Sequence, residues 1–238
     1  DKNLKTIPSA PDIHKNYGFK ALKWEADKWI ATVNHEQRIN KNWAAFLNAG
    51  YGKYDIYNPS NSDWRYTIKE DGTFKDDVRR NPFAYDNRTM QIGFRGKAVT
   101  GEVKHHLVFA YDKNWQKYYG STSWKFGEVT GTLKDGILTQ PDAVPAYPYA
   151  NPFLKRKTVY TSYKAIDNME IGKFNVMLGL TKTNVTNASV GKDAEKSDAL
   201  SPLYGIVYKP NDQFSCYVSH TESFGKGSLI SGSRYLND

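Results

Sequence analysis

The sequence contains very little cysteine and no long apolar run. Cys216 is the one cysteine among 238 residues, which excludes an internal disulfide and a zinc site built from cysteine alone. No stretch approaches the ~20 consecutive apolar residues that a membrane-spanning helix needs. A helical membrane protein is therefore excluded. A membrane β-barrel is not, because its strands alternate outward and inward side chains and so dilute the hydropathy.

Motifs of the common catalytic and metal sites are also missing. The sequence has no glycine-rich phosphate loop, no nucleophile elbow, no His-Glu-x-x-His zinc helix and no paired-carboxylate motif. His105 and His106 are adjacent and would point to opposite faces of a strand, so they cannot share a metal. We therefore expect no catalytic residue, no metal site and no cofactor. Calcium at Glu70-Asp71 or Asp76-Asp77 is an alternative to a solvated acidic loop.

Aromatic and basic residues, by contrast, are plentiful. The chain has 17 Tyr, 11 Phe and 6 Trp and a formal net charge of +8. The aromatic content fits a tyrosine-rich soluble β-sandwich or lectin, and equally the aromatic girdles of a membrane barrel. The Lys and Arg residues are scattered without a recognition motif, so nucleic-acid binding is not expected. Lipopolysaccharide phosphates or an anionic ligand suit a basic barrel rim better.

The most informative pattern is alternation with a period of two. In residues 43–51, one face carries Trp43 and Tyr51 at its ends and small apolar residues between them, the layout of a strand that crosses a bilayer. The same phase in other segments predicts one shared lipid-facing surface. Its expected members are Trp43, Ala45, Leu47, Ala49, Met90, Ile92, Phe94, Leu107, Phe109, Val176 and Leu178. Arg95, Lys97 and Lys104 fall in the opposite phase, which fits a wet lumen or a solvated sheet face.

The alternation predicts an all-β fold, an antiparallel meander of about eight long strands with no helix. The expected strands are 26–38, 42–57, 88–99, 102–115, 157–167, 172–184, 201–209 and 213–222, each near the ~9–11 residues of a tilted transmembrane strand. Short turns are expected near Lys41, Thr100, Asn168 and Asn211, and they alternate with long polar segments at 58–87, 116–156 and 185–199. We expect the first two long segments to leave the sheet at one end, opposite the turns at Lys41 and Thr100. Soluble eight-stranded barrels share a long-loop mouth with outer-membrane barrels.

Four short motifs resemble the barrel of TonB-dependent siderophore receptors. Residues 201–212, SPLYGIVYKPND, lead into 213–224, QFSCYVSHTESF, and together resemble one hairpin of that family. Residues 171–180, IGKFNVMLGL, residues 100–108, TGEVKHHLV, and residues 40–43, NKNW, resemble three further elements. The motifs follow the family order, and the resemblance covers about residues 20–225. Thr181 stands where the family usually has Arg, and Cys216 where it usually has an aliphatic residue, so the chain resembles a divergent member.

The resemblance implies that residues 1–238 form a single segment of a 22-stranded transmembrane barrel. The polar start DKNLKTIPSAPD and the polar tail SLISGSRYLND are unlike the plug domain and the terminal aromatic strand of the family. We therefore expect an incomplete barrel, without plug or C-terminal strands. Its edge strands, near 29–36 and 214–220, should not pair with each other, and the isolated chain should aggregate or misfold.

The resemblance further implies a transport receptor in the outer membrane of a Gram-negative bacterium. In the family, an iron–siderophore chelate binds at the extracellular mouth. TonB, coupled to its inner-membrane proton-motive complex, then rearranges the plug so that the ligand passes. This chain would supply barrel wall and extracellular loops, in contact with outer-membrane lipid and lipopolysaccharide. Haem or cobalamin as cargo stays open. So do two alternatives: a complete small outer-membrane barrel with a structural or adhesion role, and a soluble β-barrel ligand-binding module.

Aromatic and arginine side chains of the long segments are candidate ligand contacts by analogy with the family. Aromatic faces supply apolar area, and guanidinium groups pair with anionic oxygens. The candidates are Tyr57, Trp64, Arg65, Tyr66, Arg79, Arg80, Tyr85, Tyr118, Tyr119 and Trp124. Packing of one loop on another, or binding of lipopolysaccharide phosphate, is the alternative role for each.

Overall fold

A computed structural model describes residues 6, 8–15, 17, 19–20, 25–56, 60–62, 67–149 and 152–224. Within these ranges all regular secondary structure is β-strand, and no helix is long and apolar enough to cross a membrane. The chain divides into two compact units. One comprises Asp1–Ile30, Gly52–Asp86 and Lys117–Arg156, and the other Ala31–Tyr51, Asn87–Gln116 and Lys157–Asp238.

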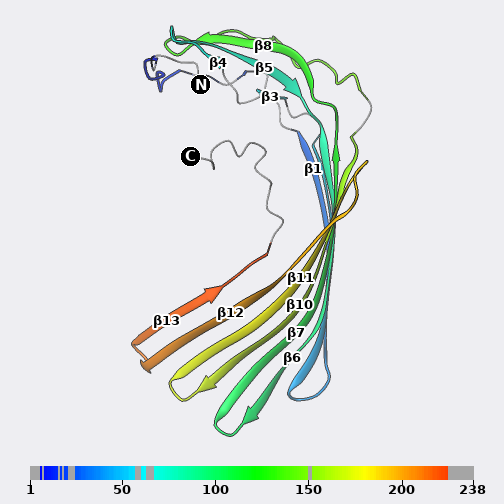
Figure 1. Ribbon diagram of the computed structural model, residues 1–238, viewed down its shortest axis with the longest axis vertical. Helices are drawn as coiled ribbons and strands as arrows, with labels where there is room; N and C mark the ends of the chain where they lie inside the picture. Colours follow the sequence, from blue (N-terminus) through cyan, green and yellow to red (C-terminus); the bar gives the residue numbers. More distant parts are fainter. Residues whose placement is uncertain are drawn as a thin grey trace. The chain divides into compact units, whose positions relative to one another are not determined.

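The larger sheet has eight strands that are neighbours in chain order (Figure 1). They are β1 (Ala26–Arg38), β2 (Trp43–Ile56), β6 (Phe83–Thr100), β7 (Val103–Gly120), β10 (Phe153–Ile171), β11 (Phe174–Ser189), β12 (Glu195–Asn211) and β13 (Phe214–Thr221). The predicted all-β meander of about eight strands is confirmed. β1 and β13 stand at the two ends of the strand order, and in the described part of the chain they do not pair with each other, as expected for an arc.

Four short turns join consecutive strands at one end of the sheet (Figure 1). Gly101 and Gly172 adopt positive φ angles of 61° and 55°, the left-handed conformation that tight hairpins require. In the first turn, Asn40 Oδ1 accepts hydrogen bonds from the backbone N–H groups of Asn42 and Trp43, which fixes the bend. The turn predicted near Asn168 is wrong, because β10 runs on to Ile171 and the chain reverses only at Gly172.

The strand ends away from these turns extend further than the sequence pattern indicated. The polar segment predicted at 185–199 is wrong, because β11 and β12 stay paired from Phe174↔Tyr208 to Asn187↔Glu195. Only residues 190–194 connect the two strands. Mostly polar residues form the paired strands here. Val185, which pairs with Ser197, is only 1% exposed. Strand β6 likewise begins at Phe83 and β7 continues to Gly120, so the two other long segments are shorter than expected.

A second sheet of five strands occupies the segments that the sequence indicated as polar loops. It contains β3 (Ser60–Ser62), β4 (Thr67–Ile68), β5 (Thr73–Arg80), β8 (Trp124–Thr132) and β9 (Gly136–Thr139). The expectation of structureless loops is therefore wrong for these stretches. Phe74 and Val78 alternate with charged residues along β5 and, with Phe19 and Val129, form a buried apolar cluster. A Cβ at Gly131 would lie 2.2 Å from Gly136 O, so β8 and β9 approach closely only because this residue is glycine.

The two faces of the larger sheet differ in chemistry. Strands β11 and β12 pair Leu178 with Tyr204 on one face and Thr181 with Ser201 on the other. Because side chains alternate along a strand, each register pair fixes the face of its neighbours. Below, the face that carries Leu178 is called the apolar face, and the face that carries Thr181 the polar face.

Candidate functional site

The polar face carries a chain of hydrogen bonds that crosses four strands. Asn48 Nδ2 donates to Gln91 Oε1 at 2.8 Å, and Gln91 Nε2 donates to Asp112 Oδ1 at 2.6 Å. Lys164 Nζ completes it with an ion pair to Asp112 Oδ2 at 2.8 Å. These side chains, Asn48, Gln91, Asp112 and Lys164, are called the polar ladder. A barrel that encloses water or a polar domain requires such a polar inner face.

Charged residues near the turn end also belong to the polar face. Arg95 Nη2 lies 2.5 Å from Glu36 Oε2, and His106 Nε2 lies 3.3 Å from Glu170 Oε1. The sequence placed Arg95 opposite the apolar phase, and the structure confirms this. Ionic side chains on this face pair across strands, so the face stays polar from the ladder to the turns.

The apolar face contains the residues that were expected to share one surface. Cross-strand contacts show which residues share this face. A Cβ at Gly96 would lie 2.3 Å from the ring of Trp43, so positions 43 and 96 are on the same face. Val176 likewise pairs with Ile206. None of the eleven predicted residues is buried, and Phe94 and Leu178 are each about half exposed. The prediction of a common face is confirmed.

Aromatic rings lie at two levels of the apolar face. Phe174 and Tyr208 stack beside the hairpin turn, with ring centroids 4.8 Å apart. Tyr111 and Tyr163 contact each other further along the strands, at 5.3 Å. Aliphatic residues fill the level between these pairs, which gives the arrangement of an apolar band bounded by two aromatic girdles.

One histidine–aspartate pair interrupts the apolar face. His105 Nδ1 lies 2.7 Å from Asp167 Oδ2, and the two side chains are only 20% and 24% exposed. Both residues share the phase of Leu107 and Phe109, so the pair lies on the same side of the sheet as the apolar band. No local sequence pattern indicates this pair, because its two members are 62 residues apart.

The first compact unit contains the candidate ligand contacts that the structure describes. Tyr57, Trp64, Arg65 and Tyr66 lie outside the described residues. Tyr118 packs against Tyr85, with centroids 5.2 Å apart, and against Phe83 at 6.4 Å. The Arg156 guanidinium lies 5.7 Å above the Tyr118 ring. We call Phe83, Tyr85, Tyr118 and Arg156 the tyrosine–arginine cluster. Phe83 and Arg156 were not among the predicted contacts, although both lie within the long segments 58–87 and 116–156.

Arg80 and Tyr119 line a pocket of about 750 Å³, and Phe83 of the tyrosine–arginine cluster lines it too. Its other walls include Tyr147, Tyr149, Lys53 and Asp55. The cations of this pocket already have protein partners. Lys53 Nζ pairs with Asp55 Oδ2 at 2.7 Å, and Arg80 Nη1 donates to Pro145 O at 2.8 Å. Because Tyr118 and Tyr119 are neighbours in β7, their side chains point to opposite faces of the strand. Tyr118 and Tyr119, although adjacent in the sequence, therefore lie in different environments.

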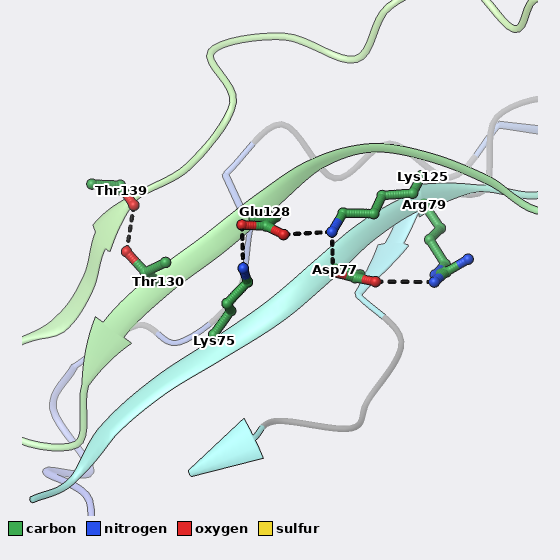
Figure 2. A network of polar contacts seen from close by, with 7 residues as sticks. All are labelled: Lys75, Asp77, Arg79, Lys125, Glu128, Thr130 and Thr139. Atoms are coloured by element: carbon green, nitrogen blue, oxygen red, sulfur yellow. Dashed lines mark hydrogen bonds and ion pairs between the residues drawn. The ribbon is translucent and has the colours of Figure 1, made fainter. Parts of the chain in front are cut away.

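Arg79 belongs to a third environment, a network of partly exposed ion pairs on β5 and β8 (Figure 2). Asp77 accepts from Arg79 Nη2 at 3.0 Å and from Lys125 Nζ at 2.7 Å. Lys125 also contacts Glu128, which in turn pairs with Lys75 Nζ at 2.6 Å. The hydrogen bond from Lys125 lowers the pKa of Asp77, and bonds from Lys125 and Lys75 lower the pKa of Glu128. The hydrogen bonds to Asp77 and Glu128 raise the pKa of Lys125.

Neither metal binding nor a direct role of Trp124 follows from this geometry. In the described residues no group of three or more His, Cys, Asp or Glu side chains could hold a metal ion. Asp77 is paired with cations, so the calcium alternative has no support at this position.

Trp124 packs on Phe126 and Tyr147, with centroids 5.8 and 6.3 Å away. Tyr147 lines the pocket, whereas Trp124 does not.

Comparison with known proteins identifies the family to which this sheet belongs. A family model described as "TonB dependent receptor-like, beta-barrel" matches residues 3–234. The chain belongs to this family of TonB-dependent receptor barrels. The family resemblance of the four motifs is thereby confirmed. Members of the family are outer-membrane proteins of Gram-negative bacteria, and they are receptors and transporters rather than enzymes.

Individual relatives are distant in sequence and longer than this chain. The ferrichrome receptor FcuA of Yersinia enterocolitica is 23% identical over 235 residues, which cover 93% of this chain and 30% of that receptor. The crystal structure of BauA, the ferric preacinetobactin receptor of Acinetobacter baumannii, matches with a TM-score of 0.73 and 22% identity, over 90% of this chain and 32% of that one. The siderophore receptor PiuA from the same organism gives a TM-score of 0.60 and 20% identity, over 90% of this chain and 34% of that one. The structural matches support the barrel fold, and the chain spans about a third of each structure.

Proposed function

We propose that this chain forms part of the barrel wall and the extracellular loops of a receptor that imports a ferric siderophore. Uptake would be driven by TonB and its inner-membrane proton-motive complex, acting through a plug domain as in the family. Family membership supports transport in general terms, and the relatives named above are receptors for siderophores. The chain's span of 30% of FcuA supports its role as one segment of a larger barrel.

The observation that carries the proposal is the contrast between the two faces of the larger sheet. A soluble barrel would bury its apolar residues inside, yet here the apolar residues are exposed and the opposite face is hydrogen-bonded through the polar ladder. Trp43 and Tyr51 bound the apolar stretch of β2, eight residues apart, which corresponds to about 27 Å along a strand. At a tilt of ~40° this rise is roughly 20 Å, close to the ~25 Å band of outer-membrane barrels.

Within the proposal, the tyrosine–arginine cluster supplies ligand contacts. The Arg156 guanidinium lies 5.7 Å from the centre of the Tyr118 ring, and a guanidinium can donate two parallel N–H bonds to anionic oxygens. In the sequence, Tyr118 follows Asp112 by an even number of residues, so alternation assigns it to the polar phase that a lumen requires. The pocket around Arg80 and Tyr119 is the weaker candidate, because Arg80 and Lys53 are already engaged by Pro145 and Asp55.

Transport of radioactive iron tests the function directly. The gene for the full-length receptor is deleted, and uptake of ⁵⁵Fe bound to single purified siderophores is measured under iron limitation. The panel should include hydroxamate, catecholate and mixed chelates, since the relatives are described as receptors for different compounds. We expect deletion to abolish uptake of one chelate and a plasmid copy to restore it.

A parallel strain without TonB separates active transport from simple passage. Loss of uptake in that strain, with binding at the cell surface retained, is the expected result. Unchanged uptake of every iron chelate after deletion would contradict the proposal, with haem and cobalamin as the next ligands to measure. Uptake that continues without TonB would contradict the energy coupling.

A further inference from the structure

A row of cationic side chains crosses the apolar face beyond the aromatic level of Tyr111 and Tyr163. On β7, Lys113 lies two residues from Tyr111, and on β10, Lys157 lies six residues from Tyr163, in both cases on the side away from the turns. Residues separated by an even number along a strand share one face, so both lysines share the face of the two tyrosines. Five neighbouring strands each contribute one member to this cation row: Arg88 on β6, Lys113 on β7, Lys157 on β10, Lys182 on β11 and Lys196 on β12.

Contacts and register assign the other three members to the same face. The Arg88 guanidinium lies 5.7 Å from the centre of the Tyr51 ring, which ends the apolar stretch of β2. Lys182 is four residues from Leu178 on β11. Lys196 pairs with the β11 residue that is eight positions from Leu178. All five cations therefore project from the apolar face, and each is exposed or partly exposed.

The row begins at the aromatic level and extends away from the turns. Ser162 Oγ and Thr183 Oγ1 lie 3.0 Å apart across β10 and β11, which makes these residues neighbours on the polar face. The adjacent positions of the two strands, Tyr163 and Lys182, are therefore neighbours on the apolar face. The other four cations lie further from the turns along their own strands.

The turn end of the apolar face has no such residues. From the turns up to the aromatic level, the described apolar-phase positions of these five strands contain neither lysine nor arginine. The lysines at the turn end, Lys97, Lys104 and Lys209, belong to the opposite phase and lie on the polar face. Lysines that served only to solvate the rims of the apolar band would occur at both of its ends. The asymmetry therefore indicates an anionic partner at one end.

The cation row keeps a net positive charge. In the described part of these strands, Asp86 and Asp198 are the acidic residues of the same phase beyond the aromatic level, against five cations. Asp198 forms an ion pair with Lys182, whose side chain is still 42% exposed. Lys113 Nζ lies 5.2 Å from the centre of the Trp115 ring. Lysine at such a place lays its alkyl stem along apolar surface and extends its ammonium to the headgroups.

We propose that the cation row binds the lipid A phosphates of lipopolysaccharide in the extracellular leaflet. Short turns of outer-membrane barrels face the periplasm, so the opposite end of the apolar band meets the headgroups of the outer leaflet. Neighbouring strands are about 4.8 Å apart, so five of them spread the cations over about 19 Å. Lipid A carries a phosphate at each end of a disaccharide and can contact several of these strands at once, whereas a glycerophospholipid presents a single phosphate.

The acyl chains of lipid A lie along the aliphatic band between the two aromatic levels. The proposal rests on the outer-membrane location of the family and is independent of the ligand that the receptor transports. A receptor that binds lipid A but imports no siderophore would contradict only the proposed function. A receptor that imports a siderophore without selecting lipid A would contradict only this site.

Native mass spectrometry of the full-length receptor that contains this chain tests the site. The delipidated receptor in mild detergent is mixed with bisphosphorylated lipid A, with the same lipid A after enzymatic removal of both phosphates, or with phosphatidylglycerol. We expect the bisphosphorylated form to be retained about tenfold more than either of the other two lipids, because only this form has two phosphates for the row.

Neutralisation of three lysines separates the cation row from the rest of the wall. In the triple variant Lys113→Gln/Lys157→Gln/Lys196→Gln, retention of bisphosphorylated lipid A should fall roughly a hundredfold, since each lysine near an anionic membrane surface contributes about fivefold. Retention of the dephosphorylated form should not change, because its acyl chains still meet the same aliphatic band.

The matched control is Lys97→Gln/Lys104→Gln/Lys209→Gln, which removes three charges from exposed residues of the polar face and should leave retention unchanged. Unchanged retention in the first triple variant, or an equal fall in the control, would overturn the proposal. Equal retention of the three lipids by the unmodified receptor would overturn it as well, so the test does not depend on how well the variants fold.

Discussion

Gln91 Nε2 donates a hydrogen bond to Asp112 Oδ1 over 2.6 Å, between neighbouring strands on the polar face. Asp112 in turn neutralises Lys164 at 2.8 Å. This aspartate therefore holds two strands to β7 at once, through contacts that run sideways within the sheet. A single-layer wall depends on such lateral contacts because it lacks a packed core.

Asp112→Ala should destabilise the wall. The change leaves Gln91 and Lys164 without their shared acceptor, at a cost of about 1–2 kcal/mol. Urea unfolding of the full-length receptor, followed by tryptophan fluorescence, measures this loss. Asp198→Ala is the control, since Asp198 and Lys182 form an ion pair at 57% and 42% exposure, where the cost should stay below ~0.5 kcal/mol. Equal losses of unfolding free energy in the two variants would show that Asp112 stabilises the wall no more than an exposed ion pair does.

Gly96→Ala should disturb the packing of Trp43. The added Cβ would lie 2.3 Å from ring atom Cδ2, which forces the indole out of its place. Overpacking of this kind costs about 1–3 kcal/mol. The double variant Gly96→Ala/Trp43→Ala should lose less unfolding free energy than the two single variants lose together, because the added Cβ no longer clashes once the indole is gone. Gly205→Ala serves as the control, because its nearest neighbour would be Ser219 Cβ at 3.2 Å. Strict additivity in the double variant would contradict the clash.

The ion-pair network of β5 and β8 predicts a dependence on pH. The pKa values of Asp77 and Glu128 are lowered in the folded chain, so their contribution is present above the unfolded values and is lost as the pH falls through the folded ones. Lys125 has a raised pKa, so its contribution is lost only as the pH rises through that higher value, in the alkaline range. The stabilising contribution of these carboxylates is therefore lost below about pH 4. Because these groups are exposed, the effect should be small and weaker at high salt.

Hydrogen exchange tests this dependence at the strands themselves. Amide protection factors of β5 and β8, corrected for intrinsic exchange, should fall between pH 6 and pH 3. Lys125→Met removes the central cation and should flatten this change. An identical fall in that variant would mean that other groups cause the acid sensitivity.

Arg156→Ala should weaken ligand uptake if the tyrosine–arginine cluster binds the chelate. Removal of the guanidinium should raise the KM for ⁵⁵Fe–siderophore uptake about tenfold, and Tyr118→Ala should act in the same direction. Arg88→Ala is the matched control, because Arg88 stacks on Tyr51 at 5.7 Å, the same distance as Arg156 on Tyr118, on the apolar phase. An unchanged KM in Arg156→Ala, or an equal rise in Arg88→Ala, would exclude the cluster as the ligand contact.

The alternation of apolar and polar residues was sufficient to predict the larger sheet. It located Trp43 and Leu178 on one face, because a strand exposed to lipid on one side and water on the other must alternate. It failed where both sides of a strand are polar, as at Asn184 and Asp198, which pair across β11 and β12. In that region the composition resembles a loop, and only the partner strand shows that the ladder continues.

The second sheet and the candidate ligand contacts were harder to predict for a related reason. Phe74 and Val78 alternate over only a few residues, and their partner strand β8 lies about fifty residues later in the chain, so no local pattern joins them. Tyr118 and Tyr119 are identical in type and adjacent in sequence, yet one packs in the tyrosine–arginine cluster and the other lines the pocket. The face that a side chain occupies depends on how the strand lies in the sheet, and the residue type alone does not reveal it.

The central claim is that one face of the larger sheet meets lipid and the other meets water. Spin labels placed singly at positions 175–181 of the full-length receptor in bilayers, after replacement of Cys216 by Ser, test this directly. Accessibility to oxygen should peak at Val176, Leu178 and Leu180, and accessibility to a water-soluble nickel chelate at Asn175, Met177, Gly179 and Thr181. This account predicts the two profiles to be out of phase with a period of two residues. Profiles that run in phase, or a nickel maximum at Leu178, would contradict it.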